Sequence, residues 1–121
     1  MSLILEGKRK SIGFTYALNG LKEVFQSEHN FRLHMLSIIL VVIAGYYFDI
    51  DTIEWLAVII VIGLVVTTEM VNTAIEEIIN YVKPEIHPAA KKIKDIAAGA
   101  VLIASLTAII VGFVIFIPKI F

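Results

Sequence analysis

Three polar side chains, Glu69, Asn72 and Glu76, interrupt an apolar stretch and carry the clearest chemistry in the sequence. Seven residues turn an α-helix by about 700°, so Glu69 and Glu76 share one helical face within about 20°, with Asn72 on or near it. Two carboxylates and an amide are oxygen ligands that a hard divalent cation such as Mg²⁺ prefers. The alternative is a structural carboxylate paired with a lysine of the loop that follows.

The depth of these carboxylates in a bilayer follows from the helix that carries them. If Trp55 marks the outer boundary, Glu69 lies roughly 21 Å further in, at 1.5 Å per residue. Glu76 lies roughly 31 Å in, at the cytoplasmic edge of a ~30 Å hydrocarbon core. Ionisable groups at such depth are costly and mark functional sites by default. Glu77, one residue round the helix, is interpreted as a solvated interfacial charge.

The composition requires a membrane around these helices. Of the 121 residues, 59% are apolar, whereas soluble domains contain about 45–50%. A chain this short cannot bury so much apolar surface in water. The net charge of −1 gives no support to nucleic-acid binding, and the lack of cysteine excludes thiolate metal sites and cysteine nucleophiles. No cleavable signal peptide is expected, because the first 32 residues lack an apolar segment.

The pattern predicts an all-α integral membrane protein that forms one domain over residues 1–121. An N-terminal amphipathic helix on the membrane surface is expected over about residues 11–27, with an ordinary helix packed on protein as the alternative. Its apolar residues recur at helical spacing: Phe14, Leu18, Leu21 and Phe25. Membrane spans are expected over about 32–48, 53–82 and 95–118, with a polar loop from Pro84 to Lys94.

Lysine and arginine set the expected orientation. Five precede the first span and four lie between the second and third, whereas residues 49–54 contain none. The positive-inside rule therefore places the N-terminus and the second loop in the cytoplasm and the C-terminus outside the plasma membrane. Along the third span, small residues recur every four positions and predict close helix packing: Ala100, Ala104, Ala108 and Gly112.

Motifs of soluble nucleotide-binding proteins are missing. The sequence contains neither G-x-x-x-x-G-K-[ST] nor G-x-G-x-x-G, so neither a P-loop nor a protein-kinase nucleotide site can form. Three lysines, Lys91, Lys92 and Lys94, stand near the start of the third span and could hold a phosphate. The residues alone therefore indicate a membrane-edge site for an anionic, water-soluble ligand plus a metal, without naming a reaction.

Two motifs carry a resemblance to a known family. E-M-V-N-T-A-I-E (69–76) and K-D-I-A-A-G-A-V (94–101) closely resemble the small prokaryotic diacylglycerol kinase family, and S-E-H-N-F-R (27–32) extends the resemblance to nearly the whole chain. Within the family the chain resembles the Gram-positive undecaprenol kinase branch at residues 53–55, 87–91 and 115–119. The resemblance implies a homotrimer with active sites shared between subunits.

The resemblance also implies a reaction: transfer of the γ-phosphate of ATP, with Mg²⁺, to undecaprenol, giving undecaprenyl phosphate. A diacylglycerol kinase making phosphatidic acid is the close alternative. A non-enzymatic membrane subunit or small ion transporter is a third reading, but transporter sites tend to lie at the bilayer midplane, and this acidic cluster lies off it.

By matching position, the resemblance implies that Glu69 is the general base, that Glu28 and Glu76 bind the metal, and that Asn72 orients this cluster. The implied nucleotide contacts are Arg9, Tyr16, Glu28, Glu76, Glu85, His87, Lys94 and Asp95. The implied lipid-substrate contacts are the stretches 13–18 and 30–34, which include Asn30 and Phe31, together with Arg9 and Glu69. Asn19 departs from the family pattern, in which a basic residue is expected as a phosphate contact.

Overall fold

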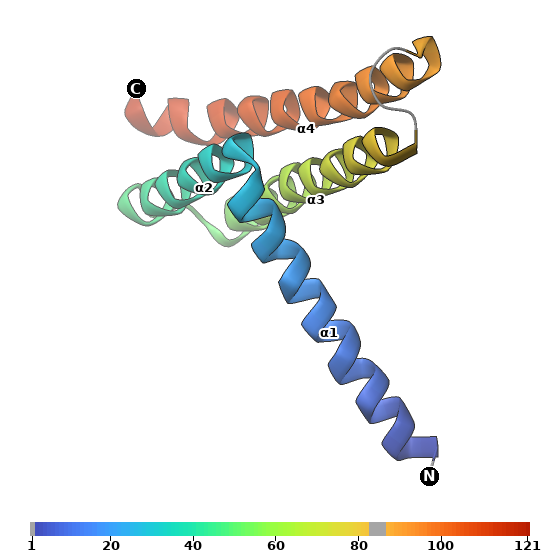
Figure 1. Cartoon of the computed structure of the whole chain (residues 1–121). Helices are drawn as coiled ribbons and strands as arrows, with labels where there is room; N and C mark the ends of the chain where they lie inside the picture. The colour runs from blue at the N-terminus through green and yellow to red at the C-terminus, as the bar shows by residue number, and fades with distance from the viewer. Residues whose placement is uncertain (1, 83–86) are drawn as a thin grey trace.

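A computed structural model describes residues 2–82 and 87–121 of the chain, with side chains from Gly13 onward. This part folds into four α-helices (Figure 1): α1 (Ser2–Ser27), α2 (His29–Tyr47), α3 (Thr52–Val82) and α4 (Pro88–Ile120). Three of them, α2, α3 and α4, are long and apolar enough to cross a membrane. The prediction of an all-α protein with three helices able to span a membrane is thereby confirmed.

The last helix begins earlier than the sequence pattern predicts. Residues from Pro88 to Lys94, expected in a polar loop, form the first two turns of α4. His87 caps this helix, since its Nδ1 accepts a hydrogen bond of 3.1 Å from the Ala89 N–H, and Pro88 takes the first helical position. Hydropathy marks where the chain enters the bilayer, not where a helix begins, and for this reason the predicted loop was too long.

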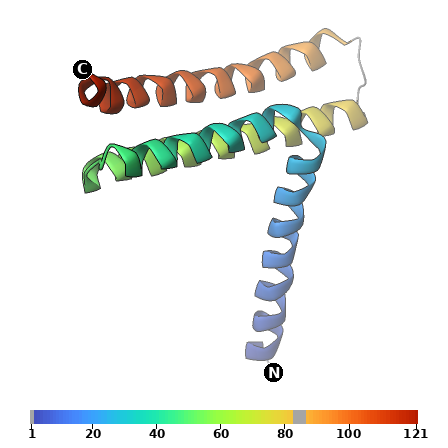
Figure 2. The ribbon, with the colours of Figure 1, turned by 90° about the vertical axis from the view of Figure 1, so that its left-hand side faces the viewer.

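The N-terminal helix α1 runs across the direction of the other three helices, as Figures 1 and 2 show from two sides. Its expected apolar stripe is exposed along its length, from 67% at Phe14 to 49% at Phe25. From Gly13 onward, Val24 is the one buried residue of α1. The apolar stripe is therefore not covered by the rest of this chain. Its placement on a membrane surface stays a prediction.

Helices α3 and α4 lie side by side along most of their length (Figure 1). Small residues of α4 allow this approach, because Ala90, Ala97 and Ala104 are buried at intervals of two helical turns. The facing side of α3 buries Val58 and Val65. The predicted stripe of small residues was correct at Ala104 but wrong at Ala100, which is exposed.

The outer surfaces of α2, α3 and α4 are apolar. Most of their large hydrophobic side chains are exposed, among them Ile39, Ile60 and Ile110. Exposure of apolar surface to water is unfavourable by roughly 25 cal/mol per Å², whereas exposure to lipid carries no such penalty. The fold therefore fits a multi-pass membrane protein in which these surfaces face hydrocarbon or neighbouring protein.

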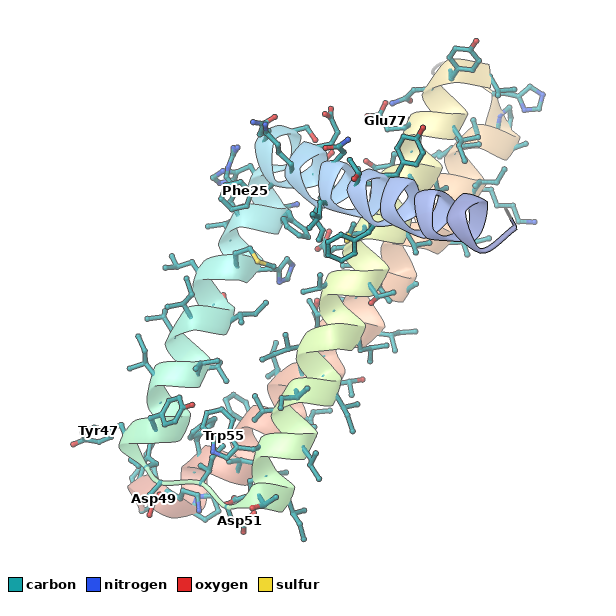
Figure 3. The ribbon with its side chains drawn as sticks, turned by 90° about the horizontal axis from the view of Figure 1, so that it is seen from below. Phe25, Tyr47, Asp49, Asp51, Trp55 and Glu77 are labelled. Atoms are coloured by element: carbon teal, nitrogen blue, oxygen red, sulfur yellow. The ribbon has the colours of Figure 1, made fainter. Side chains whose placement is uncertain are left out.

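The connection between α2 and α3 is tightly hydrogen-bonded. Asp49 adopts a left-handed backbone with φ of 51°, and its N–H donates to the Tyr46 carbonyl at 3.3 Å. The N–H of buried Ile50 donates to the Gly45 carbonyl at 3.1 Å, which completes a Schellman motif. Figure 3 shows Tyr47, Asp49, Asp51 and Trp55 together at this end, opposite Phe25 and Glu77.

The start of α3 is fixed by a reciprocal pair of hydrogen bonds. The Glu54 N–H donates to Asp51 Oδ1 at 2.8 Å, and Glu54 Oε1 accepts from the Asp51 N–H at 3.1 Å. This arrangement is a capping box with aspartate as the cap. Lys119 Nζ also lies 3.1 Å from Glu54 Oε1, so the same carboxylate ties the end of α4 to the start of α3.

We expect Gly45→Ala to destabilise this end of the molecule. A Cβ at Gly45 would lie 2.6 and 2.8 Å from Cη2 and Cζ2 of the Trp55 ring, which is too close without a backbone or side-chain shift. Such overpacking costs about 1–3 kcal/mol, and the thermal unfolding midpoint in detergent should fall. Gly63→Ala is the matched control, because its Cβ would meet nothing within 4 Å. Equal midpoints for the two variants would contradict the expected clash.

Candidate functional site

Glu69 is a buried carboxylate on the packed face of α3. It is 8% exposed, and its neighbours one turn away on either side, Val65 and Thr73, are buried as well. Its Oε1 lies 2.8 Å from Nε2 of His34 on α2. A buried carboxylate needs such a partner, because an unpaired charge away from water is strongly unfavourable. Sequence reasoning placed His34 among the lipid contacts and missed its contact with Glu69.

Asn72 and Glu76 lie together one and two turns further along α3. Asn72 Nδ2 donates to Glu76 Oε1 at 3.4 Å, a long contact, and both residues are partly buried. Asn72 Oδ1 is buried with no hydrogen-bond partner. Glu77 is exposed and lies at the end of the molecule opposite Asp49 and Trp55, as Figure 3 shows. The structure thus brings an orphaned amide oxygen next to a partly exposed carboxylate.

The junction of α1 and α2 holds the residues expected at the metal and at the lipid. Glu28 caps α2 with an extended backbone (φ −111°, ψ 111°) and makes no side-chain capping bond. Phe31 is buried, while Asn30 is exposed. Arg32 Nη1 donates to the carbonyl oxygens of Phe25 and Gln26 at the end of α1, at 3.3 and 3.0 Å. A cation at this end of a helix interacts favourably with the negative end of the helix dipole.

The start of α4 holds the expected nucleotide contacts His87, Lys94 and Asp95. Each has a local partner: His87 caps the helix, Lys94 Nζ donates to Asn80 Oδ1 of α3 at 2.6 Å, and Asp95 pairs with Lys91 at 2.6 Å. The hydrogen bond from Lys91 to Asp95 and their attraction raise the pKa of Lys91. The adjoining surface is hollowed by a pocket of about 390 Å³ lined by Lys91, Lys92 and Asp95 among others.

The other expected nucleotide contacts lie elsewhere. Tyr16 is 70% exposed on α1, Arg9 lies in the first half of that helix, and Glu85 lies outside the described residues. The first half of α1 extends away from the start of α4 in both Figures 1 and 2. One chain therefore does not bring these two sets together. Among the side chains that the structure describes, those of residues 13–82 and 87–121, no group of three or more His, Cys, Asp and Glu is arranged to hold a metal.

An open cavity of about 700 Å³ lies between α2, α3 and α4 within the membrane-spanning part. Its walls are largely apolar, with Val41, Val65 and Phe113 as examples from the three helices. His34 forms part of the wall and also contacts Glu69. Glu69 itself does not line the cavity and is linked to it through His34.

Comparison with known proteins identifies the relatives of this chain. Residues 15–116 match the family described as prokaryotic diacylglycerol kinase. The chain is 37% identical to the undecaprenol kinase of Bacillus subtilis (strain 168) over 106 residues, 88% of this chain and 86% of the relative. It is 34% identical to the diacylglycerol kinase of Synechocystis sp. over 88% of this chain and 62% of the relative. Identity to the diacylglycerol kinase of Escherichia coli (strain K12) is 32%, over 78% of each chain.

Proposed function

Because the chain belongs to the prokaryotic diacylglycerol kinase family, we propose that this lipid kinase transfers the γ-phosphate of ATP to undecaprenol and forms undecaprenyl phosphate. The observation that carries the choice of acceptor is the 37% identity to an undecaprenol kinase, which extends over most of both chains. The stretches at residues 53–55, 87–91 and 115–119 point to the same branch.

In the proposed reaction, Glu69 acts as the general base. The alcohol oxygen of the lipid attacks the γ-phosphorus while its proton passes to a Glu69 carboxylate oxygen. The bond between the γ-phosphorus and the bridging β–γ oxygen breaks, and ADP leaves with that oxygen. Phosphoryl transfer asks little covalent chemistry of the protein and depends mainly on positioning and charge neutralisation. The burial of Glu69 on a helix that is long and apolar enough to cross a membrane supports this role.

Glu28 and Glu76 are the residues that would hold Mg²⁺, and Asn72 lies beside Glu76. Mg²⁺ commonly uses one or two protein carboxylates and takes its other ligands from water and substrate phosphates, so a larger acidic cluster is not required. The unpartnered oxygen Oδ1 of Asn72, adjacent to Glu76, suits such a cation. When bound, the ion supplies charge neutralisation at the β- and γ-phosphates. Lys94 would add a positive charge from α4.

We propose further that the chain assembles as a homotrimer with active sites between subunits. In one chain the first half of α1 and the start of α4 lie apart, so nucleotide contacts on both would meet only between chains. The N-terminus and the loop before α4 would face the cytoplasm, on the distribution of lysine and arginine. The mass of the protein in detergent, measured by light scattering, tests the trimer.

The competing acceptor is diacylglycerol, because other relatives are named diacylglycerol kinases. We expect kcat/KM for undecaprenol to exceed that for diacylglycerol by at least about tenfold, a difference of about 1.4 kcal/mol in transition-state binding. Radiolabelled ATP and each lipid in the same mixed micelles provide the measurement. The Glu69→Gln variant, assayed in parallel, shows how much labelling comes from other enzymes. Faster labelling of diacylglycerol would reverse the assignment.

A further inference from the structure

We infer that His34 is a positioning residue for the base, a role that rests on the proposed function. Its Nε2 lies 2.8 Å from Glu69 Oε1, well within the range of an N–H···O hydrogen bond. In the inferred role the Nε2–H faces this carboxylate, and an N–H donor interacts more strongly with a charged acceptor than with a neutral one. Holding Oε1 in this way leaves Oε2 to receive the proton of the acceptor alcohol.

The contact joins two different helices. His34 belongs to α2 and Glu69 to α3, so the contact holds the carboxylate against a neighbouring helix, not merely within its own helix. A glutamate side chain has several freely rotating bonds, and an unheld carboxylate would sample several orientations. Both side chains are shielded from solvent, at 29% and 10% exposure, which strengthens a hydrogen bond compared with one in water.

Ser37 provides a comparison on the same face of α2. It lies close to one turn beyond His34 and lines the same cavity. Its hydroxyl, however, donates to the Leu33 carbonyl oxygen of its own helix at 3.0 Å. Loss of that hydroxyl therefore leaves the link between α2 and Glu69 intact, whereas loss of the imidazole removes it. The pair of positions separates a general disturbance of the cavity wall from a loss of carboxylate orientation.

His34→Leu should lower kcat for undecaprenol by about 10- to 100-fold, because a displacement of a reacting group by 1 Å can cost about 10²-fold in rate. The KM for Mg-ATP should stay close to wild type, whereas the thermal midpoint should fall because Glu69 loses its partner, so kcat is compared at matched amounts of folded protein. His34→Gln keeps an N–H donor and should recover most of the lost kcat, and Ser37→Ala should match wild type. A kcat within twofold of wild type for His34→Leu, or no recovery in His34→Gln, would overturn the positioning role.

A measurement without turnover separates this inference from the proposed function. ¹⁵N NMR of the imidazole in the solubilised full-length protein should show a changed Nε2 resonance of His34 in Glu69→Gln and none in Glu77→Gln. An unchanged resonance in Glu69→Gln would refute the contact. If Glu69→Gln changes the resonance but the wild-type protein phosphorylates neither lipid, the contact stands and the proposed function is refuted.

Discussion

Glu69→Gln is expected to lower kcat by about 100- to 10,000-fold, the range that a positioned general base contributes. Glutamine keeps the size of the side chain and can still contact His34, but it cannot accept the proton of the lipid alcohol. Initial rates with saturating ATP and undecaprenol, at matched amounts of folded protein, measure the effect. The binding of Mg-ATP should be unchanged, because Glu69 is assigned to the acceptor and not to the nucleotide.

Glu77→Gln is the control for this result. Glu77 carries the same functional group on the same helix but is exposed to solvent, so its loss should leave turnover near that of wild type. Both variants should insert into membranes and give the same size-exclusion profile in detergent. Near-normal turnover in Glu69→Gln would remove Glu69 from the role of base.

Glu76→Gln is expected to remove nearly all turnover by a different route. The variant loses one of two carboxylates assigned to Mg²⁺, and the loss of an outer partner of a metal ligand alone costs about 10- to 100-fold in metal affinity. The Mg²⁺ concentration for half-maximal activity should therefore rise by at least about tenfold. Titration of activity with Mg²⁺ at fixed ATP measures this shift.

The two glutamine variants differ in one respect that makes the assignment testable. Added Mg²⁺ should restore part of the activity of Glu76→Gln but none of the activity of Glu69→Gln. Nucleotide binding should be weakened in the first variant and preserved in the second. Equal responses of the two variants to Mg²⁺ would contradict the assignment of Glu69 to the base and of Glu76 to the metal.

The order and type of the helices could be predicted from the sequence, because long apolar segments in so short a chain leave few alternatives. The common face of Glu69 and Glu76 could also be predicted, since it depends only on helical geometry. Both residues turn toward the protein, with Glu69 buried and Glu76 partly so. These features need no knowledge of how one helix sits against another.

Contacts between helices could not be predicted in this way. The pairing of His34 with Glu69 depends on how α2 is rotated and shifted along α3, and no periodicity within a helix encodes that relation. The same limit applies to Ala100, which shares its residue type with Ala104 but faces outward. The hydrogen bond from Lys94 to Asn80 likewise arises from the joint placement of α3 and α4.

The early start of α4 has a thermodynamic consequence for nucleotide recognition. Fixing one flexible residue on binding costs about 1–2 kcal/mol of conformational entropy. The segment from Pro88 to Lys94 is part of helix α4, so most of that entropy is lost during folding. If this start of α4 binds the nucleotide as proposed, it would meet the phosphates as a rigid extension of the helix, and little of the binding free energy would be needed to order it.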